Sequence, residues 1–137
     1  MRAAKRRDLR LTSDDFLILG LGRLVAQKQP FGFLNAAKTL CGYFPAAKFL
    51  WVGDGTMSAQ WDRWVAQENL GGVISHVGWQ ADVIPFLFAG DLLLHVAEYE
   101  DLPLAIAEAM SAGLPCAVTR NFASEIPFLT STTFFFR

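Results

Sequence analysis

The sequence has 137 residues, of which 53% are hydrophobic and 18% charged, and its 12 basic and 13 acidic residues leave a net charge of -1. This length fits one domain with a real core, the composition excludes a disordered chain, and the charge gives no support to a nucleic-acid partner. The most membrane-like run, residues 83–97, contains Pro85 and Asp91 and is too short to span a bilayer, so we expect buried core and no transmembrane segment.

The first ten residues are basic, with positive side chains at Arg2, Lys5, Arg6, Arg7 and Arg10. Such a stretch is either a membrane or RNA patch or a solvated lead-in to a domain, and we favour the lead-in. No apolar segment of a signal peptide follows it directly. Cys41 and Cys116 lie far apart and without metal-ligand spacing, which favours reduced thiols and a cytoplasmic protein.

Short apolar runs recur along the chain, each followed by a turn and then by a stretch with helical periodicity. This alternation predicts an α/β fold: a doubly wound parallel sheet of about six strands with helices on both faces. The expected elements, in chain order, are a strand at 16–22, a helix at 31–42, a strand at 48–53, a helix from its cap Thr56 to Asn69, a strand at 73–78, a helix at 82–88, a strand at 91–96, a helix at 103–112 and a strand at 115–119. Three adjacent phenylalanines at 134–136 could add a last strand.

Candidate ligand residues follow the predicted strands, where open parallel sheets bind their ligands. Gly20 and Gly22 follow the first strand, but Val25 stands where a dinucleotide fingerprint needs its third glycine, which disfavours a nicotinamide-dependent dehydrogenase. Arg23 and Lys28 come next. They could bind a pyrophosphate together without a metal ion, or they could be solvated surface charges, and the residues alone leave both interpretations open.

Two further strand ends carry candidates. Gly53 follows the second strand in a turn with a second glycine, and Trp79 follows the third strand. Trp79 could stack on a nucleobase, or it could close the core as a lid.

The segment at 100–108 is the most informative in the chain. Pro103 suits the first turn of a helix and leaves the amides of Leu104 and Ala105 free to bind a phosphate. Glu100 precedes this tip and Glu108 follows it. Because the helix is apolar nearly all round, we expect Glu108 to be buried and to need a partner, for which the two hydroxyls of a ribose are well suited. Internal backbone amides or a lysine are the alternative partner, and we favour the ribose.

Three sequence blocks resemble the retaining glycosyltransferases of the GT-B fold, family 4. They are GRLVAQK at 22–28, FLWVGDG at 49–55 and YEDLPLAIAEAMSAGLP at 99–115, the last with the E-x7-E pattern. The likeness extends over most of residues 15–119. It implies the Rossmann-like half of a GT-B fold, namely the C-terminal domain, which binds a nucleoside diphosphate sugar such as a UDP-, GDP- or ADP-sugar and needs no metal ion.

The resemblance also implies residue roles. Arg23 and Lys28 would contact the diphosphate, as would the amides of Leu104 and Ala105. Glu108 would hold the ribose. Glu100 would contact the transferred sugar and, with the two cations, form the catalytic set. The rest of the donor site would be Gly22, Gly53 and Trp79.

The chain also departs from the family pattern. Asp101 stands where the family usually has glycine, Ala97 replaces a common serine and Gln29 a common glycine. We expect residues 1–137 to be a single nucleotide-sugar-binding domain, with the N-terminal acceptor domain and the final C-terminal helix absent. The isolated chain should then bind without turnover, while the full enzyme would act in polysaccharide or glycolipid synthesis, with peripheral membrane association as an option. The alternatives are a sugar-nucleotide epimerase or phosphorylase of the same fold, or a truncated non-catalytic nucleotide-binding module.

Overall fold

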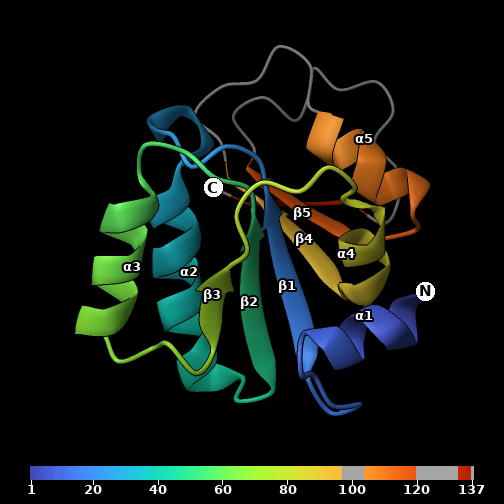
Figure 1. Ribbon diagram of the computed structural model, residues 1–137, viewed down its shortest axis with the longest axis horizontal. Helices are drawn as coiled ribbons and strands as arrows, with labels where there is room; N and C mark the ends of the chain where they lie inside the picture. Colours follow the sequence, from blue (N-terminus) through green and yellow to red (C-terminus); the bar gives the residue numbers. More distant parts are fainter. Residues whose placement is uncertain (97–103, 120–132, 137) are drawn as a thin grey trace.

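A six-stranded parallel sheet in the order β3-β2-β1-β4-β5-β6 forms the centre of the protein (Figure 1). The computed structural model describes residues 1–96, 104–119 and 133–136. This strand order is that of doubly wound nucleotide-binding sheets, in which the order reverses beside the first strand. The predicted sheet is therefore confirmed. Its strands are β1 (Phe16–Leu21), β2 (Ala47–Val52), β3 (Ile74–His76), β4 (Leu92–His95), β5 (Cys116–Thr119) and β6 (Thr133–Phe136).

Helices cover both faces of the sheet, as predicted (Figure 1). One face carries α2 (Pro30–Tyr43) and α3 (Ser58–Gln67). The other carries α1 (Arg2–Asp8), α4 (Ile84–Ala89) and α5 (Leu104–Ser111). A short 3-10 helix, η1 (Ala26–Lys28), joins β1 to α2.

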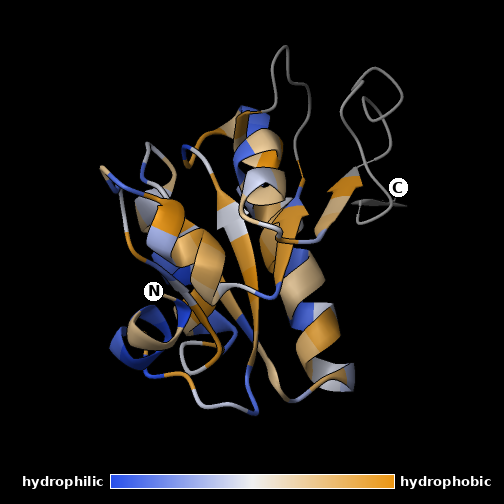
Figure 2. Cartoon of the chain, turned by 90° about the vertical axis from the view of Figure 1, so that its right-hand side faces the viewer, coloured by the Kyte–Doolittle hydropathy of each residue, from blue (hydrophilic) through white to orange (hydrophobic). Residues whose placement is uncertain are grey.

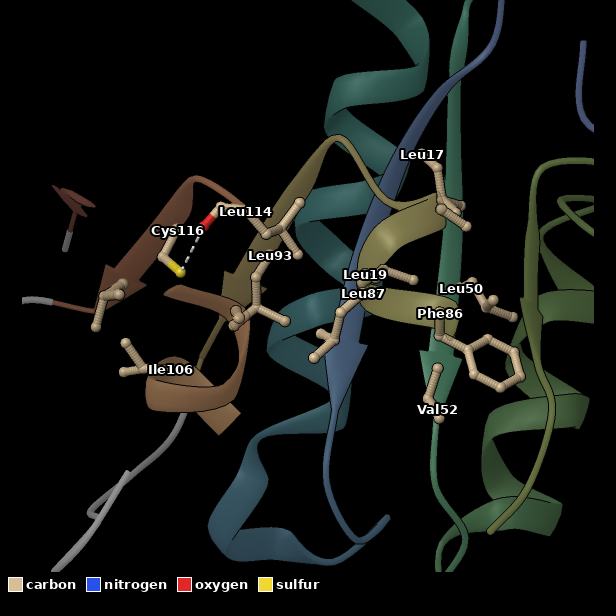
Figure 3. Close-up of a cluster of buried hydrophobic side chains, with 13 residues drawn as sticks. Leu17, Leu19, Leu50, Val52, Phe86, Leu87, Leu93, Ile106, Leu114 and Cys116 are labelled. Carbon is tan, nitrogen blue, oxygen red and sulfur yellow. Dashed lines mark hydrogen bonds between the residues drawn. The ribbon is translucent and has the colours of Figure 1, made fainter. Parts of the chain in front are cut away.

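The layer between the sheet and α4 and α5 is mainly aliphatic, with Phe86 as its buried aromatic residue (Figure 3). Leu17 and Leu19 point to this side because side chains alternate along a strand. They meet Leu87 of α4, and Ile106 of α5 completes the same cluster. Each such burial stabilises the fold by about 1.5–3 kcal/mol. Cys116 lies in this layer as a free thiol, and its burial raises its pKa to about 11.

The opposite layer is aromatic. Phe33 of α2 lies edge-on to Trp51 of β2 with ring centroids 5.3 Å apart, and Trp61 of α3 lies 5.6 Å from Trp51. Ile18 packs into the same cluster from the central strand. Figure 2 shows that the strands between the two layers are coloured hydrophobic over most of their length. The sheet is therefore buried on both faces, as expected for its near-continuous apolar strands.

Residues 84–95 of the membrane-like run form α4 and β4 and contribute to the core. Phe86 and Leu87 of α4 are buried, and so are Leu93 and Leu94 of β4. In the part of the chain that the structure describes, no helix is both long and apolar enough to cross a membrane.

Helix α1 is fastened to the rest of the domain by two arginines. Arg2 donates to the carbonyl oxygens of Phe88 at 2.9 Å and Gly90 at 2.8 Å, at the C-terminal end of α4. Its other nitrogen lies 2.7 Å from the Asp91 carboxylate. Arg6 is 9% exposed and donates to the Asp15 carbonyl at 2.7 Å and to the same carboxylate at 3.1 Å.

The expectation of a solvated basic lead-in is therefore wrong for Arg6, which is buried, whereas Arg2 is exposed as expected and is also ion-paired. The last carbonyls of α4 have no partner inside their own helix, and the half-buried Asp91 directly precedes β4, so both need donors from elsewhere in the chain. Two guanidinium groups satisfy them. Arg7 and Arg10 are exposed, as expected of a lead-in.

The start of α3 also differs from the prediction. Thr56 is exposed, and the N-cap position is Met57, which makes no side-chain cap hydrogen bond. Instead the Asp54 carboxylate accepts a hydrogen bond from the Gly55 amide at 2.8 Å and another from the Ser58 hydroxyl. The acidic side chain of the glycine turn, rather than the threonine, organises this helix start.

Candidate functional site

A cavity of about 510 Å³ opens at the carboxyl ends of the strands. It lies between the turns after β1, β2 and β3 and the beginning of α5. All the residues that the sequence assigns to nucleotide binding line it: Gly22, Arg23, Lys28, Gly53, Trp79, Leu104, Ala105 and Glu108. A larger hollow of about 690 Å³ lies at the opposite end of β1, beside α1, and holds none of these residues.

Two glycine turns form the floor of this cavity and touch each other. Gly22 and Gly53 both have φ of +143°, a conformation that side chains rarely adopt. A Cβ on Gly53 would overlap the carbonyl oxygen of Gly22, so the backbones meet where no side chain fits. Gly20 has a different role, because a Cβ there would collide with the ring of Trp51 in the core.

The two cations approach the cavity from the segment after β1. Arg23 is exposed, and no described residue forms a hydrogen bond or ion pair with its guanidinium group. Lys28 is half-buried at the end of η1, and its aliphatic stem passes over Gly22, where a Cβ would lie 3.3 Å from the Lys28 Cε. Both side chains line the same cavity. This shared position favours a common ligand over the alternative that the two are unrelated surface charges.

Helix α5 brings its first turns to the other side of the cavity. Leu104, 59% exposed, and Ala105 lie at the helix start, and Glu108 follows one turn later. No described residue bonds the Glu108 carboxylate. Pro103 and Glu100 lie outside the described residues, so their expected places beside this tip stay predictions.

The expected burial of Glu108 is wrong. Only Ile106 and Ala109 of α5 are fully buried, because the helix meets the core along that one stripe. Glu108 is half-buried on the cavity side of the stripe. The Glu108 carboxylate can therefore remain solvated without a protein partner. The argument that it binds a ligand depends on its position in the cavity wall.

Trp79 is not a lid on the core. Its side chain is 75% exposed and lines the cavity. The alternative role, closing the core, is therefore wrong, and the indole presents a flat aromatic face beside the site. Next to it, Gln80 donates from its amide to the Val77 carbonyl at 3.2 Å.

Sequence reasoning missed four wall residues: Leu21, Val52, Gln80 and Val83. The first three lie at or just beyond a strand end, a signal that could have found them, and Val83 precedes α4. Asp54, in the glycine turn after the second strand that the sequence already marks as a candidate, adds a negative charge to the wall. Its pKa is lowered, first by the hydrogen bond from the Ser58 hydroxyl and then by the Gly55 amide, so it stays ionised. Among the described residues, no group of three or more His, Cys, Asp or Glu is placed to hold a metal ion.

Comparison with known proteins supplies the context for this site. The family model described as glycosyl transferases group 1 matches residues 1–125. An Escherichia coli UDP-Gal:alpha-D-GlcNAc-diphosphoundecaprenol alpha-1,3-galactosyltransferase is 35% identical over 118 residues, which are 84% of this chain and 30% of that protein. The lipopolysaccharide core glycosyltransferase LpsD of Rhizobium meliloti is 31% identical over 84% of this chain and 32% of its own length. The chain thus spans about a third of these curated relatives.

Solved structures share the fold. HepE of Anabaena, in complex with UDP and glucose, superposes with a TM-score of 0.83 at 22% identity, over 98% of this chain and 37% of that one. The C-terminal domain of the group 1 protein LpcC from Francisella tularensis gives a TM-score of 0.82 at 21% identity, over 100% of this chain and 74% of that one. At these identities the likeness establishes the architecture.

Proposed function

The chain belongs to the group 1 glycosyltransferases, and on that premise we propose that it is the part of such an enzyme that binds the sugar donor. The donor is a nucleoside diphosphate sugar, and the full enzyme transfers the sugar to an acceptor with retention of configuration. One observation carries the proposal: a single cavity collects two cations, a helix start and a carboxylate from separate segments of the chain. We assign the acceptor to another domain.

The leaving group of this reaction is a nucleoside diphosphate, on which negative charge builds up as the sugar departs. Arg23 and Lys28 would neutralise that charge from one side of the cavity. From the other side, the free amides at the start of α5 would do the same, because a helix N-terminus attracts phosphate. The chain would contribute to catalysis through this charge stabilisation and through positioning of the donor.

The remaining wall fits the nucleoside. The Glu108 carboxylate can accept hydrogen bonds from two vicinal hydroxyls of a ribose, and Trp79 offers a face for stacking on a base. UDP and GDP are the donor nucleotides to test first, because the relatives' names include UDP-Gal and GDP-mannose. We further propose that Glu100 contacts the transferred sugar. A cytoplasmic location belongs to the same proposal, supported by two free cysteines.

The proposal is tested by calorimetric titration of the chain with UDP, GDP and ADP. We expect binding of at least one of them, and about tenfold or greater weakening in Arg23→Ala, because a charge-assisted hydrogen bond is lost. Arg63→Ala is the matched control: Arg63 is also an exposed arginine, lies on α3 away from the cavity lining, and should leave the affinity unchanged. Absence of heat with all three nucleotides, on a chain shown by circular dichroism to be folded, would overturn the proposal.

A further inference from the structure

Backbone hydrogen bonds attach the loop that carries Arg23 to the neighbouring strand and turn. The Gly22 amide donates to the Val52 carbonyl at 3.1 Å, and the Leu24 amide donates to the Asp54 carbonyl at 2.9 Å. Both acceptors belong to β2 or to the turn after it. The residues on either side of Arg23 are therefore fixed to the adjacent strand and turn.

A buried side chain makes a third attachment. The indole nitrogen of Trp51 donates to the carbonyl oxygen of Gly22 at 2.9 Å. That carbonyl belongs to the planar peptide bond joining Gly22 to Arg23. Its direction therefore fixes the orientation of the peptide group that leads into the Arg23 Cα, and with it the direction of the Arg23 side chain. Gly22 has no Cβ and φ of +143°, and thus no steric preference of its own that would hold this peptide plane.

Trp51 is well placed to hold an orientation. It is 3% exposed and lies in contact with Phe33 and Trp61, whose rings fix its indole. Gly20 packs directly against the ring, so the strand carrying the loop and the tryptophan fit closely. A leucine or phenylalanine would fill the same core, but neither has an N–H to donate.

We propose that Trp51 is a positioning residue for the donor diphosphate: it orients the Gly22–Arg23 peptide and, through it, the Arg23 guanidinium. This inference depends on the proposed function, since it assumes that Arg23 contacts the diphosphate. Trp51 touches no ligand itself. Its effect is on how much of the time Arg23 is aimed at the cavity, which is a preorganisation effect on affinity.

The test variant is Trp51→Phe, which keeps an aromatic ring in the core and removes the N–H. Affinities are measured calorimetrically for UDP and uridine, with GDP and guanosine and with ADP and adenosine as parallel pairs. We expect the diphosphate affinity to fall about fivefold, the usual worth of one hydrogen bond, while the affinity for the parent nucleoside stays unchanged. The ratio of the two affinities is the readout, because general loosening of the fold would weaken both.

Phe49→Leu is the matched control. Phe49 belongs to the same buried cluster, but its ring contacts Phe33 and makes no hydrogen bond to the loop, so its variant should lose stability without changing the affinity ratio. If wild type binds a diphosphate and Trp51→Phe binds it equally well, or if Phe49→Leu changes the ratio as much, the positioning role is refuted while the proposed function stands. If wild type binds no diphosphate, the proposed function itself fails.

A second measurement applies if Trp51→Phe does not fold. The four tryptophans give four indole N–H resonances in the wild-type chain, and Phe variants of the other three assign that of Trp51 by elimination. We expect the Trp51 signal to exchange slowly with solvent and to shift when UDP, but not uridine, is added. A fast-exchanging signal, or one that UDP leaves in place, would refute the inference.

Discussion

At the scale of single residues, the contact between Gly22 and Gly53 is the most demanding feature of the site. Neither glycine tolerates a side chain, since both have φ of +143° and the Cβ of an alanine at Gly53 would overlap the neighbouring carbonyl. The loop that carries Arg23 and the turn after β2 therefore have a shape that only two glycines permit.

We predict that Gly53→Ala lowers the free energy of unfolding by about 3 kcal/mol or more, because backbone strain and a steric overlap act together. Gly71→Ala is the control: Gly71 has open space around its Cβ position and should change stability by no more than about 0.5 kcal/mol. Urea unfolding followed by circular dichroism measures both. Equal midpoints for the two variants would contradict this account of the turn.

The sequence predicted correctly which side chains meet at the cavity, but it predicted the burial of Glu108 wrongly. The residues assigned to nucleotide binding meet at one cavity because strand ends in a parallel sheet converge. Glu108 was wrongly expected to be buried, since composition alone does not show that Ile106 and Ala109 are the only buried residues of α5. Trp51 was missed as a polar group because its indole partner lies 29 residues away.

At the scale of elements, the two-sided attachment of α1 depends on Asp91. Its carboxylate accepts hydrogen bonds from Arg2, Arg6 and the Leu17 amide. Burial opposes ionisation of this group, but the amide bond and the guanidinium groups outweigh it and hold the pKa below its ordinary value of 3.8. The charged carboxylate thus joins a helix at the start of the chain to the start of β4.

This arrangement predicts an acid-sensitive contribution to stability. A carboxylate with a lowered folded-state pKa stabilises the fold above its unfolded pKa, and that contribution disappears as the pH falls through the folded value. We expect the free energy of unfolding of the wild type to decline below about pH 4, and that of Asp91→Asn to decline less over the same interval. Asp14→Asn, at an exposed aspartate, is the control. Parallel acid profiles for wild type and Asp91→Asn, measured by urea unfolding, would count against this role.

The strands and the helices from α2 to α5 were predictable because their apolar periodicity is local. Helix α1 was not, because it is short and polar and its partners at the end of α4 and at Asp91 are more than 80 residues further along the chain. The cap of α3 was misassigned for a local reason: the side chain that organises its start, Asp54, lies two residues before the expected Thr56.

At the scale of the whole molecule, the sheet separates an aliphatic layer from an aromatic one. The two layers share every central strand, since successive residues such as Ile18 and Leu19 point to opposite sides. Neither layer can lose its structure while the sheet stays intact, so we expect the domain to unfold as one unit.

A matched pair of substitutions tests this coupling. Ile18→Val in the aromatic layer and Ile106→Val in the aliphatic layer should each cost about 1 kcal/mol. Trp51 and Trp61 both report on the aromatic layer. Ile106→Val should nevertheless shift the midpoint of tryptophan fluorescence as far as that of circular dichroism. A fluorescence midpoint that stays at the wild-type value would show that the layers unfold separately.

The hydrogen bonds between the segment after β1 and the turn after β2 have a practical consequence for protein engineering. Leu24 both donates to Asp54 and accepts from Met57, so residues 22–28 and 53–57 form one cassette although 24 positions separate them. A chimera that takes only residues 22–28 from a relative would place them on a turn, residues 53–57, that does not match them. Swaps intended to change nucleotide preference should exchange both segments together.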